Sequence, residues 1–154
     1  MAAKHRQKVK TLNNVARVTE KRVDEARLKQ QEVERQLSVN RSQLHELERY
    51  FTEYTQNIGF AAEGRNRAFA LQNYQQFMSR IEQTVEQQRN VVRQLEQRLE
   101  QTTDAVRAAN VQHRSVGKLT QRYQHRIQQD DEKQEQAMLD QFGLHNRHRG
   151  GPGK

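Results

Sequence analysis

The sequence predicts an all-α protein made of two long helices folded into an antiparallel coiled-coil hairpin. Three observations predict it: a seven-residue apolar repeat, one glycine-marked break in that repeat, and a composition too polar for a globular core. The chain has 154 residues, of which 30% are charged, and its mean hydropathy is −1.21. This small apolar content is enough for a narrow seam between helices, but it is too small for the core of an ordinary domain.

The apolar repeat runs through residues 9–58 and again through residues 71–127, with the spacing of the a and d positions of a heptad. No proline interrupts either stretch, because the single proline is Pro152. The repeat therefore predicts one helix over about residues 5–58 and a second over about residues 68–142. The seam positions are Val9, Leu12, Ala16, Thr19, Val23, Ala26, Gln30, Val33, Leu37, Asn40, Leu44, Leu47, Phe51, Tyr54 and Ile58, then Leu71, Tyr74, Met78, Ile81, Val85, Gln88, Val92, Leu95, Leu99, Thr102, Val106, Ala109, His113, Val116, Thr120, Tyr123 and Ile127.

The break at residues 59–67 contains two glycines and an asparagine, which indicate a turn between antiparallel neighbours. With its apex near residue 62 or 63, the hairpin places Leu47 opposite Met78 and Leu12 opposite His113. A slip of one heptad would lose three opposite-charge pairs that favour this register. These pairs are Arg41 with Glu82, Glu34 with Arg89, and Arg27 with Glu96.

The second helix outruns the first in this register, so residues beyond about 121 overhang, by roughly 30 Å as far as Phe142. Residues 1–142 are expected to form a single hairpin domain, and residues 143–154 a disordered basic tail. The large seam residues close to the turn predict that the turn end is the rigid half.

Polar residues interrupt the seam at Gln30, Asn40, Gln88, Thr102 and His113. In the predicted register each faces an apolar or small side chain, which costs stability but penalises wrong registers. His113 could be a metal ligand or a proton switch, but no second ligand lies at helical spacing except, weakly, a histidine at position 125. The structural interpretation of His113 is therefore favoured.

The net charge of +8 is concentrated in residues 1–22 and 105–129, and the second of these segments contains no acid. We call these two segments the basic end of the hairpin. It is either a solvated, self-repelling end or a surface that docks to an acidic partner, with the overhang adding apolar contact. The candidate docking residues are Lys8, Lys10, Arg107, Arg114, Lys118, Arg122, Met138, Leu139 and Phe142.

Two aromatic residues, Tyr50 and Phe77, directly precede seam positions. The register places both on one half-exposed flank, together with Gln43, Thr84 and Ala70. The pair either thickens the core or forms a patch that binds a partner protein, because exposed aromatic residues on a polar helix pair serve as interface anchors.

Nothing in the sequence supports catalysis or a bound cofactor. Gly59 and Gly64 lack the lysine and hydroxyl residue of a phosphate-binding loop, and the carboxylates are dispersed on outward faces. There is no cysteine, which excludes disulfides and fits a reducing compartment. No apolar stretch approaches the roughly 18 residues of a membrane span, and no signal-peptide core is present. We expect a cytoplasmic protein that is not an enzyme and needs no metal.

The segments on both sides of the turn resemble the FliJ family, the small coiled-coil components of the bacterial flagellar type III export apparatus. The resemblance is most specific in Tyr50–Tyr54, Asn73–Phe77, Ile81–Glu82 and Val85–Gln88. The length, the two-helix layout and the charged stretch Asp130–Phe142 are also similar.

This resemblance implies a fold like the antiparallel coiled coil of the gamma subunit in rotary ATP synthases. It implies a stalk that inserts into the hexameric export ATPase, promotes ring assembly and hydrolysis, and contacts the transmembrane export gate protein at the flagellar base. The membrane would be reached only through protein partners, and export chaperones are further possible partners. The gate-binding residues of the family match Gln43, Leu47, Tyr50, Tyr54, Phe77, Ile81, Thr84 and Gln88, where Thr84 and Gln88 replace the usual Ala and His.

Other functions remain open at this stage. The equivalent stalk of a virulence type III secretion system has the same layout. A basic-region coiled coil that binds nucleic acid is less favoured, because the N-terminal basic stretch already follows the heptad and lacks a base-reading face. A membrane-surface helix is disfavoured by the narrow apolar seam and the absence of tryptophan.

Overall fold

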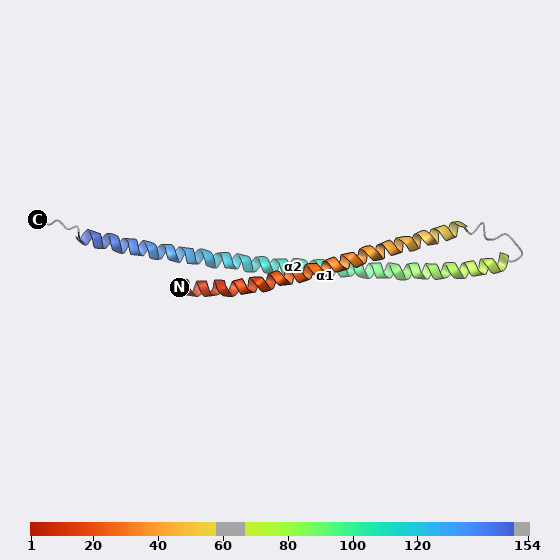
Figure 1. Cartoon of the computed structure of the whole chain (residues 1–154), viewed down its shortest axis with the longest axis horizontal. Coiled ribbons are helices and arrows are strands. Elements are labelled where there is room, and N and C mark those ends of the chain that lie inside the picture. Colours follow the sequence, from red (N-terminus) through yellow and green to blue (C-terminus); the bar gives the residue numbers. More distant parts are fainter. Residues whose placement is uncertain (58–66, 150–154) are drawn as a thin grey trace. The chain divides into compact units, whose positions relative to one another are not determined.

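The computed structural model describes residues 1–57 and 67–149, with side chains described as far as residue 147. These residues form two helices and no strand (Figure 1): α1, Ala2–Gln56, and α2, Arg67–Arg149. The predicted all-α class with two long helices is confirmed. Of the predicted turn at residues 59–67, only Arg67 is described, and it begins α2; the seam position Ile58 also lies outside the described residues.

Helix α2 continues past Phe142, where the sequence predicted its end. Residues 143–149, expected in a disordered tail, are helical, and residues 150–154 lie outside the described residues. The helix passes through Gly143, which costs only about 1 kcal/mol relative to alanine and does not break a hydrogen-bonded ladder. No helix in the described part of the chain combines the length and the apolarity needed to cross a membrane.

The chain divides into two compact units, which are described separately. Unit 1 comprises residues 1–24 and 107–154, and unit 2 comprises residues 25–106. Within each unit a part of α1 packs antiparallel against a part of α2, as the hairpin predicts. The prediction of one domain over residues 1–142 stays a prediction.

Burial follows the predicted heptad closely. Every predicted seam position within residues 1–57 and 67–149 is buried or half-buried, except Tyr54. In unit 2 the core is formed by Leu37, Val92 and Leu95, with partly buried leucines packed against them. Leu37 is only 2% exposed. The deepest burial therefore lies away from the turn, and the expectation that the turn end is the rigid half stays a prediction.

The predicted register is wrong by one heptad at the seam. His113, which was expected opposite Leu12, bonds to Thr19, seven residues further along α1. The flanking ion pairs differ too: Arg41 pairs with Glu96 and Glu48 pairs with Arg89, each at 3.2 Å, in place of the predicted pairs. A heptad repeat matches a and d positions equally well after a slip of seven residues, so the apolar pattern alone does not distinguish the two registers.

Hydrogen bonds between polar seam residues favour the observed register. In the predicted register these residues faced apolar or small neighbours, whereas in the structure they bond to one another across the helices. A polar group inside a seam costs free energy unless it is hydrogen-bonded. The observed register is therefore favoured over the predicted one. Thr19 bonds to His113 at 2.8 Å, and Gln30 donates to Thr103, the neighbour of the seam residue Thr102, at 3.1 Å. Gln88 donates to Asn40 at 2.9 Å, a contact that lies between the predicted and the observed register.

Removing one member of such a pair is expected to destabilise the protein. In Thr19→Val the buried hydroxyl is lost and the His113 Nδ1 atom has no partner, at a cost of about 1–3 kcal/mol in the free energy of unfolding. The double variant Thr19→Val with His113→Leu is expected to regain much of this loss, because both polar groups are then removed. Urea denaturation of the four proteins in this cycle measures the coupling, and strictly additive losses would contradict it.

Gly117 lies in the interior of α2, and a Cβ atom built on it meets nothing within 4 Å. Gly117→Ala is therefore expected to stabilise the protein by about 0.5–1 kcal/mol, because alanine loses less backbone entropy in a helix. The reverse change at an exposed position of the same helix, Ala108→Gly, is the matched control and should destabilise by a similar amount. Urea midpoints measure both, and an unchanged midpoint for Gly117→Ala would count against this account.

Candidate protein-docking surfaces

The predicted site residues form two groups, and each group lies inside one unit. The residues matched to gate binding lie between positions 43 and 88, in unit 2. The residues predicted to dock at the basic end all lie in unit 1. Each surface can therefore be described from the contacts of its own helix pair.

In unit 2 the matched residues all occupy heptad positions d and g, which lie on one side of the seam. We call them the d/g strip: Gln43, Leu47, Tyr50, Tyr54, Phe77, Ile81, Thr84 and Gln88. Contacts across the helices join the two ends of the strip. Gln88 donates to Gln43 at 3.5 Å, and the rings of Tyr54 and Phe77 lie 5.1 Å apart between centroids. The other four residues of the strip have the same spacing on both antiparallel helices, so they lie between these two contacts. They are Leu47, Tyr50, Ile81 and Thr84.

Aromatic side chains dominate the exposed part of the d/g strip. Tyr50, Tyr54 and Phe77 are 46%, 44% and 45% exposed. The rings of Tyr54 and Phe77 meet edge to face at 80°, so Phe77 has its ring partner in Tyr54. Tyr54 was expected to fill the seam, and its exposure corrects that expectation. Its ring lies beside that of Phe77.

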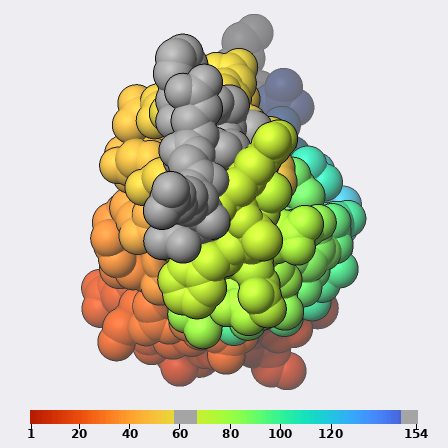
Figure 2. Space-filling view, turned by 90° about the vertical axis from the view of Figure 1, so that its right-hand side faces the viewer, coloured from red at the N-terminus to blue at the C-terminus, as the bar shows by residue number. Residues whose placement is uncertain are grey.

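Neighbouring groups hold this part of the strip in place. The Tyr74 hydroxyl donates to the backbone oxygen of Tyr54 at 2.9 Å, which ties the end of α1 to α2. The Arg49 guanidinium lies 5.5 Å from the centroid of the Tyr50 ring. Figure 2 views the molecule from the end where α1 finishes and α2 begins, and the last described turns of α1 (yellow) and the first of α2 (yellow-green) both reach the surface there.

Two seam members of the strip, Leu47 and Ile81, behave as the sequence predicted. Leu47 and Ile81 are half-buried between the helices, whereas Gln43 and Thr84 are exposed. Gln88 is half-buried and its amide donates to Asn40 as well as to Gln43. The strip thus combines three accessible rings with a half-buried aliphatic base, the combination that serves as an anchor in protein interfaces.

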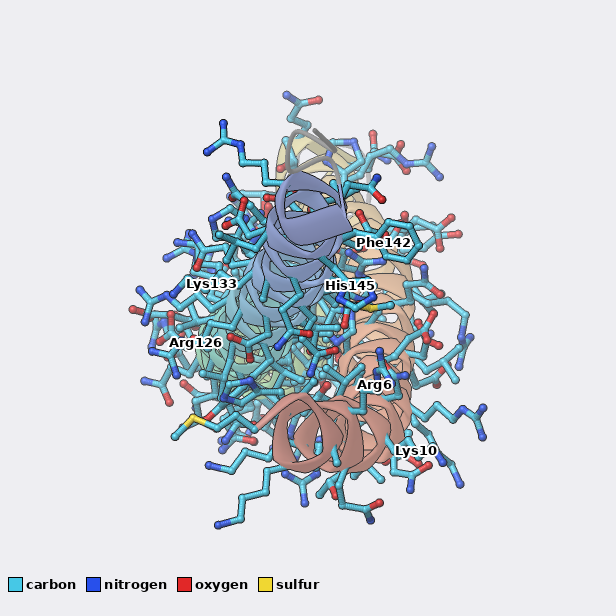
Figure 3. The ribbon with its side chains drawn as sticks, turned by 90° about the vertical axis from the view of Figure 1, so that its left-hand side faces the viewer. Arg6, Lys10, Arg126, Lys133, Phe142 and His145 are labelled. Atoms are coloured by element: carbon cyan, nitrogen blue, oxygen red, sulfur yellow. The ribbon has the colours of Figure 1, made fainter. Side chains whose placement is uncertain are left out.

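In unit 1 most of the predicted docking cations point into solvent. Within the described residues Lys10, Arg114, Lys118 and Arg122 are exposed and form no hydrogen bond or ion pair. Arg107 is exposed too and has an interaction of its own. Figure 3 shows Lys10 projecting outward from α1. Unpaired exposed cations on one helix pair produce a positive potential that attracts acidic partners.

Lys8 differs from the other cations because it is held by Tyr123. Its ammonium donates to the Tyr123 hydroxyl at 3.1 Å and lies 5.1 Å from the ring centroid. The Arg126 guanidinium lies 5.5 Å from the same centroid. The sequence did not indicate this contact, because the predicted register left Tyr123 beyond the end of α1.

The first turns of α1 are tied to α2 by two acids that follow the acid-free segment. His5 Nδ1 lies 3.3 Å from the Asp130 carboxylate, and Arg6 pairs with Asp131 at 3.2 Å. The predicted overhang from about residue 121 is therefore too long. Residues 132–147 are all exposed, so the overhang of α2 begins after Asp131.

The overhang carries an exposed apolar cluster. Met138, Leu139 and Phe142 are each about 70% exposed, and the cluster also contains Leu144, which the sequence prediction did not include. An open hollow of ≈ 510 Å³ lies among Met138, Phe142 and Leu144. In Figure 3 Phe142 projects from the side of α2 opposite to the cations at positions 126 and 133. Such exposure on a polar helix is typical of a binding surface.

No chemistry is indicated at either surface. Among residues 1–57 and 67–149, no three His, Cys, Asp or Glu side chains are grouped as a metal site would require. His113, the one candidate ligand inside the seam, bonds to Thr19. What the arrangement provides is an aromatic strip in unit 2 and a cationic and apolar surface in unit 1, both suited to binding proteins.

The family model described as "Flagellar FliJ protein" matches residues 7–151 of the chain. The match extends over parts of both units and over every candidate docking residue named above. No curated protein and no solved structure matches the chain.

Proposed function

Because the chain belongs to the FliJ family of flagellar proteins, we propose that it is the non-catalytic stalk and adaptor of a bacterial flagellar type III export ATPase. In this role it inserts into the ATPase hexamer, promotes its assembly and hydrolysis, and links it to the transmembrane export gate. It works on the cytoplasmic side of the inner membrane at the flagellar base, with export chaperones as further partners. The observation that carries the proposal is the family match over residues 7–151.

Co-purification with an export ATPase hexamer tests the proposal most directly. The tagged chain is expected to retain the hexamer and to raise its rate of ATP hydrolysis. A chain that neither retains the hexamer nor changes its rate would contradict the assignment.

Unit 1 is the part that docks in the ATPase ring. Four of its cations are exposed and unpaired within the described residues, and the overhang adds the apolar cluster of Met138, Leu139 and Phe142. Long-range attraction by the cations orients the encounter, and burial of the apolar cluster supplies affinity. Lys8 contributes through Tyr123, and Arg107 adds charge next to the free cations.

Unit 2 is the part that contacts the export gate, through the d/g strip. Its three exposed rings are the anchors, and Gln43 and Thr84 are exposed polar neighbours at its edge. Interface energy is concentrated in such aromatic anchors. The seam members Leu47 and Ile81 support the rings from beneath.

Reversing three of the exposed cations is expected to abolish most of the ATPase stimulation. The variant is Arg114→Glu with Lys118→Glu and Arg122→Glu, and stimulation by the unaltered protein should also fall as salt is raised, because exposed charges are screened. The matched control makes the same change in charge in unit 2, by Arg27→Glu, Lys29→Glu and Arg98→Glu. Hydrolysis rates and helix content are measured together. Equal loss in both variants would contradict docking through unit 1.

A further inference from the structure

Unit 2 has a second surface, on the side of the seam away from the d/g strip. A groove of ≈ 630 Å³ lies there between α1 and α2. Its floor is formed by the seam residues Phe51 and Val85, and its rim carries the carboxylates of Glu48, Glu82 and Glu86. The rim residues occupy heptad positions e and b, whereas the strip occupies d and g, so the two surfaces face in different directions.

The floor of this groove is apolar and incompletely covered. Val85 is buried, but Phe51 is only half-buried although it occupies a core position of the heptad. In three-helix coiled coils a groove of this kind between two helices is filled by the side chains of a third helix.

The charge of this region is opposite to that of the chain. The chain carries a net charge of +8, but acids exceed bases around the groove. In residues 43–57 and 77–90 the acids are Glu46, Glu48, Glu53, Glu82 and Glu86, and the bases are Arg49, Arg80 and Arg89.

Only part of this negative charge is compensated within the groove. Arg89 lies 3.2 Å from Glu48 and 3.7 Å from Glu86, so one guanidinium is shared by two carboxylates. Arg93 approaches Glu86 only at 3.9 Å. Glu82 forms no ion pair within the described residues. The rim therefore presents negative charge beside an apolar floor, and it is complementary to a cation next to an apolar side chain.

We propose that this groove binds a cationic amphipathic helix of a partner protein. An apolar side chain of that helix packs on Phe51 and Val85, and a lysine or arginine one turn away pairs with Glu82 and Glu86. A helix forms its own backbone hydrogen bonds and can at the same time insert apolar side chains between two other helices, so it suits this groove. Because the groove and the d/g strip lie on different sides of the seam, both can be occupied in the same molecule.

The test uses a designed helical peptide of about 18 residues with leucines on one face and flanking lysines. Binding to the full chain is measured by fluorescence anisotropy. The expected result is binding that weakens about tenfold or more in Glu82→Lys with Glu86→Lys, and that weakens as salt rises. Because Glu86 also contacts two arginines, Thr52→Lys serves as a second variant that adds a cation to the rim without removing an ion pair.

Two controls make the outcome specific. Glu132→Lys with Glu135→Lys makes the same change in charge in unit 1 and should leave peptide binding intact. Tyr50→Ala with Phe77→Ala alters the d/g strip and should also leave it intact, so a failure of the gate assignment is distinguished from a failure of this one.

Three results would overturn the proposal. The first is equal binding of a peptide whose lysines are replaced by glutamates. The second is unchanged affinity in both rim variants with intact helix content. The third is self-association of the chain at micromolar concentration that the rim variants abolish, because the occupant would then be a second copy of this chain.

Discussion

Leu37→Ala is expected to lower the free energy of unfolding of unit 2 by about 2–5 kcal/mol, the largest single effect on stability. Leu37 is 2% exposed and packs with Val92 and Leu95, against which Leu44 and Leu99 are also packed. Truncation leaves a cavity at the point where both helices contribute most of the buried apolar surface. Urea denaturation followed by circular dichroism measures the loss.

The matched control for Leu37→Ala is Leu28→Ala. Leu28 lies on the same helix in the same unit but is 65% exposed. A substitution at such a surface position is expected to change stability by no more than about 0.5 kcal/mol. Similar losses at the two positions would show that the heptad frame does not determine the core.

Truncation of the aromatic residues in the d/g strip is expected to give the largest loss of export-gate binding. Tyr50→Ala, Tyr54→Ala and Phe77→Ala should each weaken binding by about 1–3 kcal/mol, or about 5- to 150-fold in affinity. All three rings are nearly half exposed, so each change removes an anchor without emptying the seam. Because the rings of Tyr54 and Phe77 touch, their double variant should lose less than the sum of the single losses.

Gate affinity and melting temperature are measured on the same variants. Phe69→Ala is the matched control, since Phe69 is an aromatic residue of unit 2 that is 66% exposed and lies outside the strip. It should change neither quantity. If the strip variants melt as early as Leu37→Ala, the rings belong to the core and the gate assignment fails.

The heptad frame could be predicted from the sequence because apolar residues recur at its a and d positions, and the helices are stabilised by burying that face. The register could not be predicted from apolar residues alone, because every slip of one heptad places a similar apolar set in contact. The polar seam residues carried the missing information. Matching Thr19 with His113 and Gln30 with Thr103 would have selected the observed register, since buried polar groups are nearly always hydrogen-bonded.

The candidate surfaces were predicted to different extents. The position of Phe77 on an exposed flank followed from the heptad, whereas the exposure of Tyr54 did not, because the heptad assigns Tyr54 to the seam. The contacts of Asp130 and Asp131 with the start of α1 were missed together with the register. A signal was present, because these acids directly follow a long segment that contains none.

The hydrogen bonds that side-chain amides form across the helices of unit 2 also limit how α1 and α2 can move along each other. Gln88 donates to both the backbone oxygen and the side-chain oxygen of Asn40, at 3.0 and 2.9 Å, and Gln30 donates to Thr103 on the same interface. Sliding one helix along the other breaks these bonds together, and each polar group left buried without a partner costs about 1–3 kcal/mol. Axial displacement within unit 2 is therefore opposed by these polar contacts in addition to the apolar seam, and the two helices are expected to move along their axes together.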